Sequence, residues 1–148
     1  MTRHFVPSLL LLLATAAALP AQQAELRLPG LSGGALTDAE LARGSHIVVF
    51  WTTWSPRGRD IVARVNELVD GFGERVVTVN FQEDAADVRS FLAGKNLRAP
   101  VYLDSTGALS KKYRVNSAPW LVLLQDGRLA YSESLPAEAA AVIRRALG

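Results

Sequence analysis

The sequence of 148 residues contains no cysteine. This absence excludes disulfide bonds, thiolate metal sites, thiol nucleophiles and dithiol redox chemistry in this chain, because each of them needs a cysteine sulfur. It also excludes a lipid attached through cysteine and a mixed disulfide with another protein. Any activity of this chain must therefore come from other side chains or from its backbone.

Histidine and clustered charge are also scarce. Only His4 and His46 are present, and 16 basic and 14 acidic residues give a net charge of +2. Charges of both signs are scattered, so the pI of about 9.3 gives no support for nucleic-acid binding. Glu83, Asp84 and Asp87 form an acidic cluster, but no histidine lies near them in the sequence. We predict a solvated helix start there, with no metal and no cofactor.

The N-terminal segment has the pattern of an export leader. Arg3 precedes an apolar stretch, residues 9–18, and small residues follow it. We predict a signal peptide over residues 1–21, cleaved after Ala21 or, as the alternative, after Ala18. The apolar stretch is short for a spanning helix, which needs ~20 residues; an uncleaved anchor is the other alternative. The expected product is exported, to the bacterial periplasm, and is free of the membrane after cleavage.

Residues 22–148 are predicted to form a single domain, because this length supports one core and no linker or repeat interrupts it. Thr37 and Glu40 have the spacing of a capping box for a short helix. Apolar strands are expected at residues 46–50, 76–81, 100–103, 120–124 and 129–132, with longer helices beginning near residues 55, 83 and 136. This order predicts an α/β fold with a central mixed sheet and helices on both faces.

The most informative stretch is Phe50–Arg59, with the sequence FWTTWSPRGR. An apolar strand leads into it, and an amphipathic helix follows, with Ile61, Val65 and Leu68 at helical spacing. Serine is a favoured N-cap, and proline is tolerated at the first helical position because its missing N–H would be unpaired there. The stretch is therefore predicted to turn from a central strand into a helix.

This stretch resembles the active-site turn of the thioredoxin superfamily, in which the segment has the sequence F-W-A-x-W-C-x-x-C. Ser55 stands at the position of the first cysteine and Gly58 at that of the second. Three other segments resemble the exported TlpA/ResA-like disulfide reductase branch: residues 28–44 its N-terminal extension, residues 83–103 its central helix–strand insertion, and residues 116–119 its cis-proline segment. The resemblance implies a thioredoxin-like fold with both additions, and a cis peptide bond before Pro119.

In that family the cis-proline bend lies beside the first cysteine, and its flanking backbone pairs with an extended substrate segment. No catalytic residue is expected here, since Ser55 would need an adjacent general base and His46 begins the strand that ends at the turn. We expect instead a monomeric domain without dithiol activity, which binds an exported protein or an extended peptide. The binding residues implied by the resemblance are Trp54, Ser55, Pro56, Arg57, Ala118, Pro119 and Trp120.

Each of these residues has a structural alternative. Ser55 could cap the helix or donate its hydroxyl to a bound thiol or carbonyl, and the two tryptophans could pack in the core or form an aromatic floor for a ligand. Arg57 could be solvated or bind an anion. Two other functions also stay open. One is a non-dithiol enzyme that binds a thiol cofactor such as glutathione through Ser55. The other is a structural or assembly module of a TlpA-like pathway that uses another surface.

Overall fold

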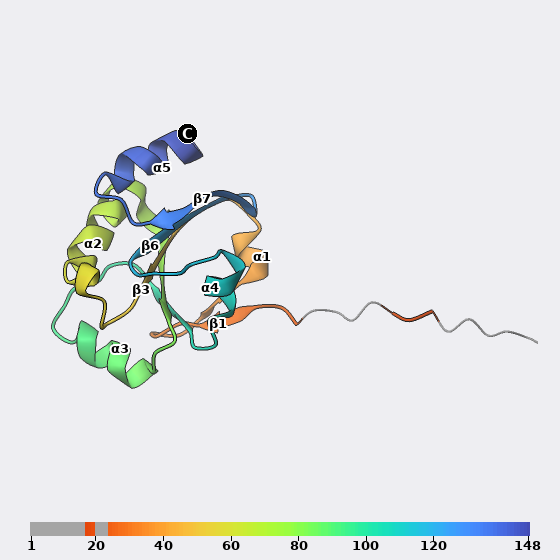
Figure 1. The fold of residues 1–148 in the computed structure, drawn as a ribbon, viewed down its shortest axis with the longest axis horizontal. Coiled ribbons are helices and arrows are strands. Elements are labelled where there is room, and N and C mark those ends of the chain that lie inside the picture. Colours follow the sequence, from red (N-terminus) through yellow and green to blue (C-terminus); the bar gives the residue numbers. More distant parts are fainter. Residues whose placement is uncertain (1–16, 20–23) are drawn as a thin grey trace, which may run out of the picture.

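A five-stranded mixed sheet in the order β5-β4-β3-β6-β7 forms the centre of the structure (Figure 1). The computed structural model describes residues 17–19 and 24–148. Strand β4 runs parallel to β3 and β5, whereas β6 runs antiparallel to β3 and β7. The strands are β3 (Ser45–Trp51), β4 (Val76–Phe81), β5 (Val101–Asp104), β6 (Trp120–Gln125) and β7 (Arg128–Ser134).

Helices cover both faces of this sheet, as the sequence predicts (Figure 1). Alternate residues of β3 enter two cores: Ile47, Val49 and Trp51 pack on one face, and Val48 and Phe50 pack on the other. Full burial of each such side chain contributes about 1.5–3 kcal/mol. The first face carries α2 (Ile61–Phe72), α3 (Ala85–Leu92) and α5 (Ala139–Leu147); the second carries α4 (Ala108–Lys112), α1 (Asp38–Leu41) and a hairpin of β1 (Arg27–Pro29) and β2 (Ala35–Thr37).

The N-terminal hairpin is joined to α1 by the predicted capping box. The Glu40 N–H donates to Thr37 Oγ1 at 3.2 Å, and the Thr37 N–H donates to Glu40 Oε2 at 2.9 Å. The hairpin loop reaches the sheet edge, where the Leu31 N–H donates to the Val101 carbonyl at 2.8 Å. Gly30 allows this tight loop, because a Cβ there would lie 2.0 Å from the Gly33 carbonyl oxygen.

The last helix begins later than predicted, at Ala139 instead of near Pro136. The reason is a side chain from α2: Arg64 donates to the carbonyls of Leu135 and Pro136, at 3.2 and 2.8 Å, and holds this segment outside the helix. The predicted leader and its cleavage sites fall on a segment of which only residues 17–19 are described, so they stay predictions. Within residues 17–19 and 24–148, no helix has the length and apolar character needed to cross a membrane.

Candidate functional site

The sheet topology brings the turn after β3 beside the segment before β6. Because β6 is antiparallel to β3, Phe50 near the end of one strand pairs with Trp120 at the start of the other. The Ser55 hydroxyl closes the contact, since its Oγ donates to the Ala118 carbonyl at 2.8 Å. The Ala118–Pro119 peptide bond is cis, which is the conformation expected from the sequence. Two segments more than 60 residues apart in the chain thus form one site.

Ser55 stands at an N-cap position, but its side chain caps no backbone N–H, so the interpretation that its hydroxyl caps a helix is wrong. Ser55 precedes a three-residue 3₁₀ turn, Pro56–Gly58, and its side chain makes no capping hydrogen bond. The α-helix α2 begins only at Ile61. The hydroxyl points to Ala118 instead, and the side chain is buried, with 8% of the residue exposed.

The position of the second cysteine is open beside Ser55. The Gly58 N–H donates to the Ser55 carbonyl at 3.0 Å, which closes the 3₁₀ turn. A Cβ placed on Gly58 would lie 3.6 Å from the Ser55 Cβ and 3.9 Å from the Thr52 carbonyl oxygen, both ordinary contacts. The backbone at this turn therefore still accepts two facing side chains.

Nothing around Ser55 turns its hydroxyl into a nucleophile. Its proton is directed to a backbone carbonyl, which is not a general base. His46, the one histidine within the described residues, lies at the start of β3, where its Nε2 is 2.9 Å from the Glu40 carbonyl oxygen and 2.8 Å from that of Arg43. No group of three or more His, Asp or Glu side chains in the described part of the chain is placed to hold a metal ion.

The rim of the turn is exposed and contains an aromatic side chain. Trp54 is 71% exposed, so it is not a core residue, whereas Trp51 is 1% exposed and packs between the sheet and α2. Pro56 and Arg57 follow it at the surface, and within the described residues Arg57 forms no ion pair. An exposed tryptophan next to an unpaired guanidinium offers apolar area and a donor to a partner.

Trp120 lies beside the turn through its backbone, but its ring is held elsewhere. Its indole N–H donates to Ser132 Oγ at 3.0 Å, and the Ser132 hydroxyl donates to the Tyr113 carbonyl at 2.8 Å. The ring packs with Phe50 in the core on the α4 face. The structure therefore brings residues 54–57 to Ala118 and Pro119, and it directs the Trp120 ring into a different hollow.

A hydrogen-bond network at Glu83 holds the start of the turn. The Thr53 N–H donates to Glu83 Oε2 at 2.9 Å, the Thr53 hydroxyl donates to Oε1 at 2.5 Å, and Asn80 Nδ2 donates to Oε2 at 2.6 Å. Glu83 is half-buried, so its prediction as part of a solvated helix start is wrong. Sequence reasoning missed this role of Glu83, although Trp51 and Asn80 are paired near the carboxyl ends of neighbouring parallel strands, which meet at one edge of the sheet.

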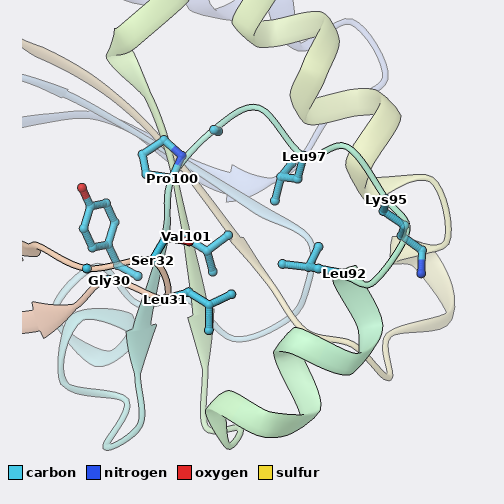
Figure 2. Close-up of a pocket in the computed structure, with 11 residues that line it drawn as sticks. Gly30, Leu31, Ser32, Leu92, Lys95, Leu97, Pro100 and Val101 are labelled. Atoms are coloured by element: carbon cyan, nitrogen blue, oxygen red, sulfur yellow. The ribbon is translucent and has the colours of Figure 1, made fainter.

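A separate small cavity lies away from this site. Its volume is about 160 Å³, and it lies between the N-terminal hairpin loop and the segment that joins α3 to β5. Leu31, Leu92, Leu97 and Val101 line it, and the Lys95 amine points away from it (Figure 2). Its lining includes no carboxylate and no histidine, so it offers little chemistry.

Replacing Ser55 by Ala is expected to lower the free energy of unfolding by about 1 kcal/mol, the usual contribution of one such hydrogen bond. Ala118 is half-buried, so water can reach its carbonyl when the hydroxyl is gone. Chemical denaturation measures the change. Ser90→Ala is the control, because Ser90 is exposed on α3; we expect it to stay within about 0.5 kcal/mol of the parent. Equal stability of the two variants would contradict a role for the contact with Ala118.

Comparisons with known proteins identify the family and the fold of this chain. A model of the AhpC/TSA family matches residues 20–145. The chain is 29% identical over 86 residues to the sporulation thiol-disulfide oxidoreductase A of Bacillus subtilis (strain 168). That match covers 54% of this chain and 52% of the relative, so the chain spans about half the length of the curated relative it matches.

Solved structures agree on the fold. The pneumococcal exposed lipoprotein thioredoxin Etrx1 from Streptococcus pneumoniae strain TIGR4 superposes with a TM-score of 0.71 at 21% identity, covering 82% of this chain and 97% of that one. A DsbE-type thiol:disulfide interchange protein from Chlorobium tepidum gives 0.68 at 22% identity, covering 84% and 94%. Both likenesses extend over nearly the whole described domain, including the sheet that carries the site.

Proposed function

Because the chain belongs to the AhpC/TSA family and has the thioredoxin-like fold without any cysteine, we propose that it binds proteins and does not exchange disulfides. The ligand is an extended peptide segment of an exported protein. The binding residues are the rim of the turn, residues 54–57, and the cis-proline segment, Ala118–Pro119. The protein acts as a monomer and needs no cofactor.

The observation that carries this proposal is the contact between Ser55 and Ala118. The hydroxyl joins the turn to the cis-proline segment at 2.8 Å, so the two walls of the former redox site are in direct contact. A carbonyl oxygen has two lone pairs, and Ser55 uses one of them. Ala118 is half-buried as a residue, and the second lone pair of its carbonyl is the acceptor that we assign to a peptide N–H. Trp54 supplies exposed aromatic area beside it.

The same contact disfavours a thiol-cofactor enzyme. The Ser55 hydroxyl has one proton, which it donates to Ala118, and no side chain within the described residues accepts a proton from it. A bound thiol would have to displace this contact and would find no base to ionise it. Binding of glutathione is therefore the competing outcome in the experiment below.

We also propose that the protein works outside the cytoplasm. The support is the leader pattern of residues 1–21 together with the relatives, one of which is described as an exposed lipoprotein thioredoxin. A lipoprotein form is excluded for this chain, since it has no cysteine to carry the lipid.

An NMR titration of the full chain tests the binding site. Short uncharged peptides and reduced glutathione are added separately, and the expected result is that the peptides alone shift the amides of Ser55–Gly58 and Ala118–Trp120. Trp54→Ala should weaken peptide binding by about fivefold to thirtyfold, because truncation of a contact tryptophan commonly costs about 1–2 kcal/mol. Trp54→Phe, which keeps an aromatic ring, should retain most of the affinity.

The other outcomes each reject the proposal in a different way. Shifts with glutathione alone would favour the cofactor enzyme. Shifts with neither probe would leave the old redox site as an inherited scaffold and favour an assembly role for another surface. Trp54 is 71% exposed, so a loss of binding in Trp54→Ala does not reflect unfolding, and unchanged thermal denaturation verifies this.

A further inference from the structure

A larger groove lies on the α4 face of the sheet, next to strand β7. Its volume is about 690 Å³, within the range of ligand sites. We name it the β7 groove, and it is lined by Lys112, Tyr113, Arg114, Asn116, Trp120, Leu129, Ala130, Tyr131 and Ser132. None of these residues belongs to the site proposed above, although the sequence predicts Trp120 there.

The groove adjoins a free sheet edge. Strand β7 pairs with β6 on one side and with nothing on the other side within the described residues (Figure 1). Edge strands are commonly protected by prolines or by charged side chains along their length. In β7 the charges lie near the ends, at Arg128 and Glu133, and the four residues between them, Leu129–Ser132, are uncharged. The register with β6 shifts at Ala130, which forms a β-bulge between Leu129 and Tyr131, so an added strand would pair with the outer backbone groups on the Tyr131–Ser132 side of the bulge.

The face of the sheet beside this edge is apolar and incompletely covered. Leu129 pairs with Leu124, which is fully buried on the α4 face, yet Leu129 itself is 52% exposed. The helix α4 is only five residues long, and α5 contacts β7 from the opposite face. The Trp120 ring, fixed by its hydrogen bond to Ser132, forms the adjoining floor. An apolar side chain that packs on Leu129 and Trp120 would shield the exposed part of this face from solvent.

The charged residues that line the groove are both cations. Lys112 is paired with Asp38 at 3.2 Å, whereas Arg114 has no hydrogen bond from its side chain and no ion pair within the described residues. Arg114 also has φ of +58°, at the position after a helix end where glycine is usual. An arginine in this conformation is strained relative to glycine.

From these observations we propose that the β7 groove binds an acidic extended peptide segment of a partner protein. The segment adds to the free edge of β7, so that its alternate residues point into the groove. One of them is apolar and covers Leu129 and Trp120. Another, two positions away, is Asp or Glu and its carboxylate pairs with the Arg114 guanidinium. This site is independent of the turn at Ser55, and a partner could occupy either one.

Binding is tested on the full chain with the peptide ETLTETLT and with its matched forms QTLTQTLT and KTLTKTLT, by calorimetry and by NMR. We expect the acidic peptide to bind at least about fivefold more tightly than the glutamine form, and we expect added salt to weaken its binding. The NMR shifts that it causes should fall on residues 128–134. The lysine form should not bind. Replacement of Arg114 by Gly should weaken the acidic peptide by about fivefold or more, whereas Arg114→Lys should keep most of the affinity.

The glycine variant separates binding from folding. Glycine adopts a positive φ without strain, so Arg114→Gly should have a thermal midpoint equal to or above that of the parent. Arg59→Ala is the control: it removes the same charge from an exposed position outside the groove, so the affinity of this variant for the acidic peptide should equal that of the parent.

Four results would overturn the proposal. The first is equal affinity for the acidic and glutamine peptides, and the second is an equal effect of the variants at Arg59 and Arg114. The third is a set of shifts confined to Ser55–Gly58, which would assign the peptide to the former redox turn. The last is self-association by sedimentation with β7 shifts in the absence of peptide, which would identify the occupant as a second copy of this chain.

Discussion

The double variant Ser55→Cys with Gly58→Cys is expected to form a reversible disulfide and so to regain the redox reaction that this chain lacks. The 3.6 Å between the Ser55 Cβ and a Cβ on Gly58 lies within the 3.5–4.5 Å found in disulfides. Gly58 has a negative φ that any residue adopts, and its Cβ would meet no atom closer than that. Arg57 and Arg59 flank the second position and should favour the thiolate.

Oxidised glutathione measures the reaction directly. One molecule oxidises the two introduced thiols to a disulfide and is itself reduced to two molecules of glutathione, and dithiothreitol reverses the step. Titration of free thiols should fall from two to zero per chain, and the oxidised form should be two mass units lighter than the dithiol. The single variants Ser55→Cys and Gly58→Cys serve as controls, because neither can close an internal disulfide; each can form only a mixed disulfide with glutathione or a disulfide with a second chain.

The alternative result is equally specific. If the double variant folds but takes up two glutathione molecules in place of closing an internal bond, the two positions do not face each other and the assignment of the turn is wrong. If the disulfide closes, the loss of redox chemistry traces to the two side chains, because the backbone at residues 55–58 still has the geometry for it.

The sequence predicted the fold and the two halves of the site because the information is local or repetitive. The pattern around Phe50 and Ile61 specifies a strand, a turn and a helix, and each is fixed mainly by its own neighbours. The meeting of Ser55 with Ala118 then follows from strand order, since an antiparallel β6 must start where β3 ends. The resemblance to the thioredoxin superfamily predicted this meeting of segments more than 60 residues apart, and the observed strand order explains it.

The direction of individual side chains could not be predicted in the same way. The Ser55 hydroxyl had two possible roles: accepting a hydrogen bond from a helix N–H or donating one to a distant carbonyl. In the 3₁₀ turn it accepts none from the backbone, and it donates to Ala118. Trp120 flanks the turn in sequence, but strand alternation and Ser132 turn its ring into the β7 groove. The direction of a side chain depends on neighbours from other strands, so it cannot be predicted from residue type and spacing along the chain.

Glu83 is the clearest case, and it leads to the second large effect. Replacing Glu83 by Ala is expected to lower the free energy of unfolding by about 2–3 kcal/mol. The loss removes the acceptor of three hydrogen bonds from Thr53 and Asn80. Asn80 is 1% exposed and its Oδ1 already has no partner, so water cannot easily replace the carboxylate at its Nδ2.

Two variants isolate this effect from the general loss of an acidic residue. Asp84→Ala removes the adjacent carboxylate, which is exposed and makes no capping hydrogen bond, so its cost should stay below about 1 kcal/mol. Glu83→Gln keeps the shape of the side chain but places an NH₂ donor beside the donors of Thr53 and Asn80. Its loss of unfolding free energy should therefore lie between those of Asp84→Ala and Glu83→Ala. Urea denaturation gives the free energies of unfolding, and the hydrogen-exchange rate of the Thr53 amide measures how often the turn opens locally.

The exchange measurement decides what the network does. If Glu83→Ala speeds exchange at Thr53 far more than in the centre of β3, the carboxylate holds the turn specifically, and peptide binding at Trp54 should weaken with it. If exchange rises equally in both places, the residue contributes only to global stability. If neither stability nor exchange changes, the hydrogen bonds to Glu83 do not contribute in solution, and the turn is fixed by Ser55 and by the packing of Trp51.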